Sequence, residues 1–359
     1  MQTPGVARCV RVSDVTRPPF VPGERLCGAF YRETVRPLLN GVPHAAALLG
    51  WGSDVLGYDT ERSVDHGWGP RLHVFVDDDR PAKALAAMLD DRLPQQFEGW
   101  PVRFGWDAVP AQHHVTITTV ARWSFDYLGV DATVGMSRLD WLLAPQQRLL
   151  GVVGGVVYAD DTGALQHLRE VLAWYPDQVW RWLLACQWRR LAQEEAFVSR
   201  TAQVGDQTGS AITAARLVRD MMRLVMLLER RYAPYQKWLG TAFAHLSHGD
   251  DLPLYLAGAL DASDAAARES ALAAAWSALA IRHNDAGLTA PVDPATRNYH
   301  ERPALVLMAD RLVDACLATV TDPALRSLPL IGAIDQVIDT AEVLQNPTVY
   351  RRLANLYEQ

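Results

Sequence analysis

Leu49-Gly50-Trp51-Gly52-Ser53 is followed, after eleven further residues, by Asp65-His66. The apolar run 45–49 is expected to form a strand that ends in this glycine-rich turn. Glycine lets the backbone approach a ligand closely, and the N–H groups of such a turn can converge on phosphate oxygens. The stretch therefore predicts a strand and a turn, with Gly52 and Ser53 as phosphate-binding residues.

Asp65 is expected to open the next strand, at the edge of the sheet that carries the turn. Carboxylate oxygens suit Mg²⁺, which commonly shares its ligands with substrate phosphates. A phosphate-binding turn and a Mg²⁺-binding carboxylate are parts needed to transfer a nucleotidyl group from a nucleoside triphosphate (NTP). We therefore expect Asp65 to bind Mg²⁺ and to be catalytic, with Asp59 as a further candidate metal ligand. The structural alternative is that Asp65 caps a strand and pairs with Arg71.

These residues resemble the signature of the nucleotidyltransferase superfamily, which includes DNA polymerase β and kanamycin nucleotidyltransferase. That signature is a hydrophobic residue, Gly-Ser, a spacer of about ten residues, and Asp-x-Asp or Asp-x-Glu. The segments Gly50–Leu72, Tyr232–Phe243 and Ile331–Thr340 look more closely like an uncharacterised bacterial nucleotidyltransferase-like family, over about residues 25 to 345. The resemblance implies an N-terminal nucleotidyltransferase-like α/β domain followed by a helical bundle.

The chain departs from the superfamily pattern at two places. Gly67 stands where the second acid of the Asp-x-Asp pair is expected, and 113–120, the strand expected to hold a third acid, contains none. Two-metal catalysis requires more than one carboxylate. Other acids in the loops are candidates for the missing ligands: Asp59, Glu61, Asp77 and Asp107, with His66 as a further one.

Three residues outside the turn are candidate phosphate contacts. Lys237 is one of only two lysines in the chain and lies in the family-like segment Tyr232–Phe243, together with Tyr235. The alternative for Lys237 is a surface position with its stem packed on Trp238. Arg71 is the third candidate.

Periodicity changes along the chain and predicts an α+β fold. Residues 1–22 are expected to form an extended arm, 23–158 an α/β domain and 159–359 an all-α bundle. The helices and strands that we expect fall at 24–40, 71–76, 81–93, 102–106, 115–120, 164–174, 177–197, 208–231, 235–247, 263–282, 303–319 and 331–345. Asp206 is the expected N-cap of the helix 208–231.

Composition excludes several classes of protein. The chain of 359 residues has a net charge of −7, so a nucleic-acid partner is not expected. Cys9, Cys27, Cys186 and Cys316 are too dispersed for a zinc site or a disulfide framework. The start of the chain has no signal-peptide pattern, and no apolar run reaches the ~20 residues of a membrane span, so we expect a cytoplasmic protein.

Several further features have structural explanations. His113 and His114 would point to opposite faces of a strand, so they are not expected to share a metal ion. Asp335 and Asp339 are four residues apart, on one face of the expected helix 331–345, where a salt bridge is the simplest role. Residues 298–303 are expected to lead into a helix.

Two functions follow from the sequence. The first is an enzyme that transfers a nucleoside monophosphate from an NTP to a small-molecule acceptor with Mg²⁺. The second is a catalytically silent nucleotidyltransferase-fold protein that binds a nucleotide, another ligand or a protein partner, and Gly67 favours it. An enzyme that modifies tRNA would need a positively charged groove beside Ser53. The oligomeric state is not predicted.

Overall fold

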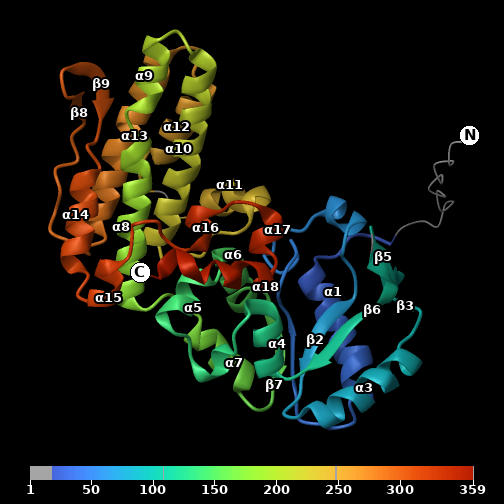
Figure 1. Ribbon diagram of the computed structural model, residues 1–359. Helices are drawn as coiled ribbons and strands as arrows, with labels where there is room; N and C mark the ends of the chain where they lie inside the picture. The colour runs from blue at the N-terminus through green and yellow to red at the C-terminus, as the bar shows by residue number, and fades with distance from the viewer. Residues whose placement is uncertain (1–17, 108, 247–248, 359) are drawn as a thin grey trace, which may run out of the picture. The chain divides into compact units, whose positions relative to one another are not determined.

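The computed structural model describes residues 18–107, 109–246 and 249–358 (Figure 1). Contacts divide the chain into two units. The first, here called the α/β unit, comprises the chain up to Thr119 together with Gly155–Thr162, and the second, the helical unit, comprises Val120–Gly154 and Gly163–Gln359. The expected α+β class is confirmed. The division by contacts differs from our boundary at residue 158, because the helices from Val120 to Gly154 belong to the helical unit.

The α/β unit contains a mixed five-stranded sheet with the strand order β5-β6-β2-β1-β7. Strand β1 is antiparallel to both β2 and β7, whereas β2 and β6 are parallel and β5 and β6 are antiparallel. Every residue of β1 is buried, as the apolar run predicted. The strands are β1 (Ala45–Leu48), β2 (Arg71–Phe75), β5 (Arg103–Trp106), β6 (Val109–Thr118) and β7 (Val156–Asp160).

Helical segments pack an apolar core against this sheet. The expected helix 24–40 is α1 (Gly23–Phe30), continued by a π-helical turn, η1 (Tyr31–Val35), and by α2 (Arg36–Leu38). Leu26, Phe30 and Val35 share a core cluster with Leu72 and Val74 of β2. The other elements of this unit are the 3₁₀-helix η2 (Glu61–Asp65), α3 (Asp79–Arg92), β3 (Gln96–Phe97) and β4 (Trp100–Pro101).

The helical unit is built around long helices. Helix α8 packs against α10 and α14, and α12 packs against α13. Asp206 caps α10 as expected, since its Oδ1 accepts a hydrogen bond from the N–H of Gly209 at 2.7 Å. The elements are α4 (Val120–Leu128), η3 (Ala132–Val134), α5 (Arg138–Leu143), α6 (Gln146–Val153), α7 (Ala164–Val171), α8 (Asp177–Glu194), α9 (Phe197–Gln203), α10 (Gln207–Leu228), α11 (Gln236–Ala244), α12 (Leu252–Asp261), α13 (Ala265–Asp285), β8 (Arg297–Tyr299), β9 (Arg302–Val306), α14 (Asp310–Thr319), α15 (Pro323–Ser327), α16 (Ile334–Val337), α17 (Ala341–Leu344), α18 (Pro347–Tyr350) and η4 (Arg351–Tyr357).

Two expectations for the C-terminal part were wrong. Residues 298–303 do not lead into a helix, because β8 and β9 form a hairpin there, and α14 begins only at Asp310. The expected helix 331–345 is two short helices, α16 and α17, separated by an extended segment that begins at Ile338. Helix α12 was not anticipated.

The structure describes three of the four cysteines. Cys27, Cys186 and Cys316 are buried free thiols, and Cys9 lies outside the described residues. Within the described ranges, none of the helices combines the length and the apolar character needed to cross a bilayer. Most of the expected arm 1–22 also lies outside the described residues.

Candidate functional site

The glycine-rich turn lies directly after β1. Gly50 and Gly52 have φ angles of 94° and 122°, a region that L-residues with a side chain rarely adopt. Tyr58 donates its backbone N–H to the carbonyl of Ser53 at 2.8 Å, which closes the turn. In the described part of the chain, no hydrogen-bond acceptor pairs with the backbone N–H of Gly52 or Ser53. These two donors are therefore available to an anion.

The buried ion pair between Asp54 and Arg71 holds the turn in place. The Arg71 guanidinium donates to both carboxylate oxygens of Asp54, at 3.0 Å from Nε and 2.7 Å from Nη2, and also to the carbonyl of Trp51 at 2.6 Å. Only 5% of Arg71 and 3% of Asp54 are exposed. Burial acts to lower the pKa of Arg71, but the charge and hydrogen bonds of Asp54 outweigh it and raise the pKa above its ordinary value. Arg71, our candidate phosphate contact, thus pairs with Asp54 and not with Asp65.

The two candidate metal ligands have different surroundings. Asp65 is the last residue of η2 and is exposed, so it does not open the next strand as we expected, since β2 begins at Arg71. Asp59 is engaged in the fold, because its Oδ2 accepts from the N–H of Gly23 at 2.7 Å and from the indole Nε1 of Trp68 at 2.9 Å.

The residues present do not fit a two-metal site. Among the described residues, no three or more His, Cys, Asp or Glu side chains are grouped so that they could hold a metal ion. Asp54 is neutralised by Arg71, Asp59 is held by structural hydrogen bonds, and Gly67 supplies no carboxylate. Of the other candidates, Asp65 is exposed and the Asp107 carboxylate lies 3.4 Å from Nδ1 of His66. Among the described residues, Asp65 is thus not part of the shared set of carboxylates that two-metal chemistry needs.

Gly67 is required by its surroundings. Its φ angle is 63°, and a Cβ atom added there would lie 2.6 Å from Cη2 of Trp51. Gly69 is similar, since an added Cβ would lie 2.7 Å from Cε1 of Phe104. Aromatic rings therefore occupy the space that side chains at positions 67 and 69 would need.

Lys237 and Tyr235 lie in the helical unit, at the start of α11. Lys237 is exposed, and its Nζ lies 4.9 Å from the ring centroid of Trp238. The Trp238 indole N–H donates to the hydroxyl of Tyr235 at 2.7 Å. This packing matches the structural alternative for Lys237, and a phosphate-binding role for either residue stays a prediction.

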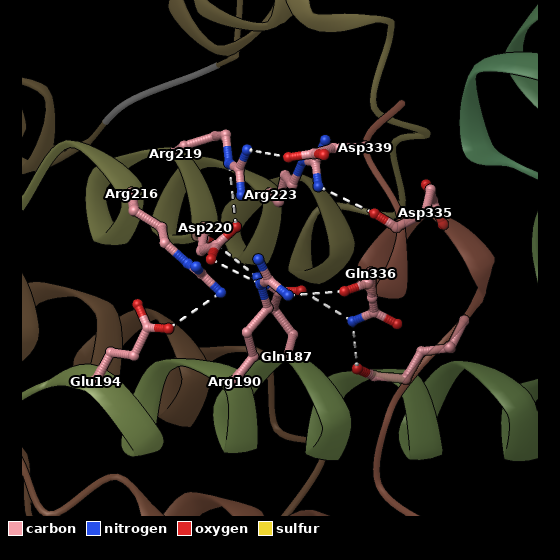
Figure 2. A network of polar contacts seen from close by, with 11 residues as sticks. Gln187, Arg190, Glu194, Arg216, Arg219, Asp220, Arg223, Asp335, Gln336 and Asp339 are labelled. Atoms are coloured by element: carbon pink, nitrogen blue, oxygen red, sulfur yellow. Dashed lines mark hydrogen bonds and ion pairs between the residues drawn. The ribbon is translucent and has the colours of Figure 1, made fainter. Parts of the chain in front are cut away.

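A polar network in the helical unit was not anticipated from the sequence (Figure 2). Asp220 of α10, 2% exposed, accepts a hydrogen bond from Nε of Arg190 at 2.7 Å and lies 3.4 Å from Nε of Arg219. Arg190 also donates to the carbonyl of Gln336 at 2.8 Å, so the network joins α8, α10 and α16. These contacts join the three helices through side chains of opposite charge, which indicates a structural role for the network.

Asp335 and Asp339 belong to this network but have separate roles. Because α16 ends at Val337, the two residues do not share a helical face, contrary to our expectation. Asp339 is exposed and pairs with Arg219 at 3.0 Å. Asp335 is buried, and burial raises the pKa of its carboxyl despite the nearby charge of Arg223.

His113 and His114 have different partners, as their places on a strand predicted. His113 lies 3.7 Å from the Asp90 carboxylate, whereas the Nε2 of His114 is 2.9 Å from the carbonyl of Phe104. Burial lowers the pKa of both imidazoles. They are part of the packing around β5 and β6.

A comparison with protein families matches part of the helical unit. Residues 141–239 match a family model described as a domain of unknown function, DUF4037. This segment includes Tyr235 and Lys237 but not the turn at Gly52. No curated protein matches the chain. The match is in keeping with a resemblance to an uncharacterised family, and it brings no activity with it.

Proposed function

We propose that the α/β unit binds a nucleoside triphosphate, or a related phosphate-bearing ligand, without transferring a nucleotidyl group. The observation that carries the binding is the turn at Gly52 and Ser53, whose N–H groups have no acceptor among the described residues. Converging backbone N–H groups bind phosphate oxygens without a metal ion.

The acids near the turn support a protein that binds without transferring. Asp54 and Asp59 already have structural partners, and position 67 carries no side chain. The protein would then use a nucleotidyltransferase-like fold as a ligand-binding scaffold. The alternative is an enzyme that transfers a nucleoside monophosphate to a small-molecule acceptor, with Mg²⁺ held by Asp65. Experiment must distinguish this enzyme from the binding protein.

Calorimetric titration of the full chain with each of the four NTPs, in EDTA and in Mg²⁺, tests this proposal. We expect binding that persists in EDTA, and no pyrophosphate release when labelled NTP is incubated with a panel of acceptors. If no NTP binds, the proposed binding site is overturned. Mg²⁺-dependent pyrophosphate release that Asp65→Asn abolishes and Asp91→Asn retains would overturn the silent assignment, since Asp91 is an exposed residue of α3.

A further inference from the structure

A continuous group of rings lies beside the turn, here called the aromatic row: Trp51, His66, Phe104, Trp106 and His114. The ring centroids of Trp51 and Trp106 are 5.4 Å apart, and those of Trp106 and His114 are 5.0 Å apart. The ring centroid of His66, the residue after η2, lies 6.0 Å from that of Trp106 in β5. The row therefore brings together the turn after β1, the end of η2, and strands β5 and β6.

The backbone between η2 and β2 is adapted to these rings. Gly67 and Gly69 both have positive φ angles, of 63° and 154°, and both approach a ring of the row too closely for a side chain. Two glycines with this property, two residues apart, indicate that the loop is built around the rings. The backbone between η2 and β2 thus packs directly on the rings of Trp51 and Phe104.

Trp51 is held in place and yet open to solvent. The Arg71 guanidinium lies 4.7 Å from the Trp51 ring centroid, over one face of the indole. Nevertheless, 49% of Trp51 is exposed, and so is 57% of the His66 side chain. An exposed ring that is already immobilised loses little conformational entropy when another ring stacks on it.

The surroundings of Trp51 suit a neutral planar ligand. The guanidinium lies over one face of the indole and its charge is balanced by Asp54, so the exposed part of the ring can stack with a neutral planar ring. The unpaired N–H groups of Gly52 and Ser53 lie one and two residues further along the same turn. A molecule that combines a planar ring with phosphate can therefore contact both.

We propose that Trp51 is a stacking platform for the nucleobase of the bound nucleotide, whose phosphates contact the N–H groups of Gly52 and Ser53. This inference rests on the proposed function, and it assigns base recognition to the aromatic row. Base–aromatic stacking tolerates different bases because every base has a π-face. The platform would thus favour nucleotides over sugar phosphates without selecting strongly among purines and pyrimidines.

The test compares the binding of ATP, adenosine and ribose 5-phosphate to the wild type, Trp51→Phe and Trp51→Leu by calorimetry. Stacking is worth about 1–3 kcal/mol per base, so Trp51→Leu is expected to weaken ATP and adenosine about 5- to 150-fold and to leave ribose 5-phosphate unchanged. Trp51→Phe should retain most of the affinity. Phe125→Ala, which removes another exposed ring, in the helical unit, should have no effect.

The failures of the two proposals are distinguishable. ATP binding that is equal in the wild type and Trp51→Leu would overturn the platform and leave the phosphate site standing. An equal loss of ribose 5-phosphate and ATP binding in Trp51→Leu would also overturn it, since the substitution would then act through the turn. If the wild type binds none of the three ligands, both proposals are overturned. Circular dichroism of each variant verifies that it is folded.

Discussion

A Cβ atom at Gly67 would lie 2.6 Å from the Cη2 atom of Trp51. The position at which the superfamily pattern expects a second carboxylate is therefore closed by an indole ring. The absence of that acid and the presence of Trp51 are two aspects of one local packing arrangement. A substitution that restores the acid alone meets a steric obstacle as well as an unfavourable φ angle.

Gly67→Asp should accordingly destabilise the α/β unit by roughly 1–3 kcal/mol. Part of this loss comes from the overlap with Trp51, so Gly67→Asp should be about 1 kcal/mol less destabilising in a Trp51→Ala background. Urea denaturation with hydrogen-exchange mass spectrometry of peptides from this unit measures both values. Additive effects of the two substitutions would contradict the packing explanation.

The Asp54–Arg71 pair leads to a second prediction. Asp54→Asn leaves the guanidinium buried without its counter-charge, which is expected to destabilise the α/β unit by about 3–5 kcal/mol. Asp90→Asn is a matched control, because Asp90 pairs with Arg103 through a carboxylate that is 73% exposed, and a loss below about 1 kcal/mol is expected. Similar losses for the two variants would contradict the larger contribution of the buried pair to the stability of the unit.

Arg219 allows the same comparison within the helical unit, since it contacts two aspartates of different burial. Asp220 is 2% exposed and also binds Arg190, whereas the Asp339 side chain is 65% exposed. Asp220→Asn should destabilise the helical unit by about 3–5 kcal/mol and Asp339→Asn by less than about 1 kcal/mol. Thermal unfolding of both variants gives the comparison. A larger loss for Asp339→Asn than for Asp220→Asn would mean that the stability of the network depends on the exposed pair.

The burial of His283 leads us to predict that the stability of the protein depends on pH. Its Nδ1 accepts from the indole N–H of Trp188 at 3.1 Å, so its Nε2–H donates to Thr289 Oγ1 at 3.0 Å. The imidazole is fully buried, and burial lowers its pKa from 6.5 to about 4. The neutral ring stabilises the fold above pH 6.5, and this stability is lost as pH falls from 6.5 through about 4, by roughly 3 kcal/mol in total.

The variant His283→Gln, which has no titratable group, tests this dependence. Its unfolding free energy should fall less steeply than that of the wild type between pH 6.5 and about pH 4, as followed by urea denaturation. Parallel pH profiles for the two proteins would mean that other groups govern the acid sensitivity of the helical unit.

The sequence predicted the elements whose signals are local. β1, β2 and α3 follow from an apolar run, from alternation and from a helical pattern with Pro81 in its first turn, and α10 begins close to its predicted cap at Asp206. The β8–β9 hairpin was missed because Leu305 and Val306 fit a helical stripe as well as a strand. Short apolar segments do not distinguish the two by periodicity.

The candidate site was harder to predict because its contacts are long-range. The partner of Arg71 is Asp54, seventeen residues earlier in the chain, and nothing in the sequence favoured it over Asp65. The aromatic row depends on which strand lies beside the turn, and hence on the strand order. The turn itself could be found, because two closely spaced glycines after an apolar run are a local signal.

A crystal structure of the protein with ATP and Mg²⁺ tests the central claim most directly. The account predicts the adenine ring stacked on Trp51, phosphate oxygens within hydrogen-bond distance of the N–H groups of Gly52 and Ser53, and no metal ion bridging two carboxylates. A nucleotide bound away from this turn would contradict it, and so would an ion held between Asp65 and a second acid beside Ser53.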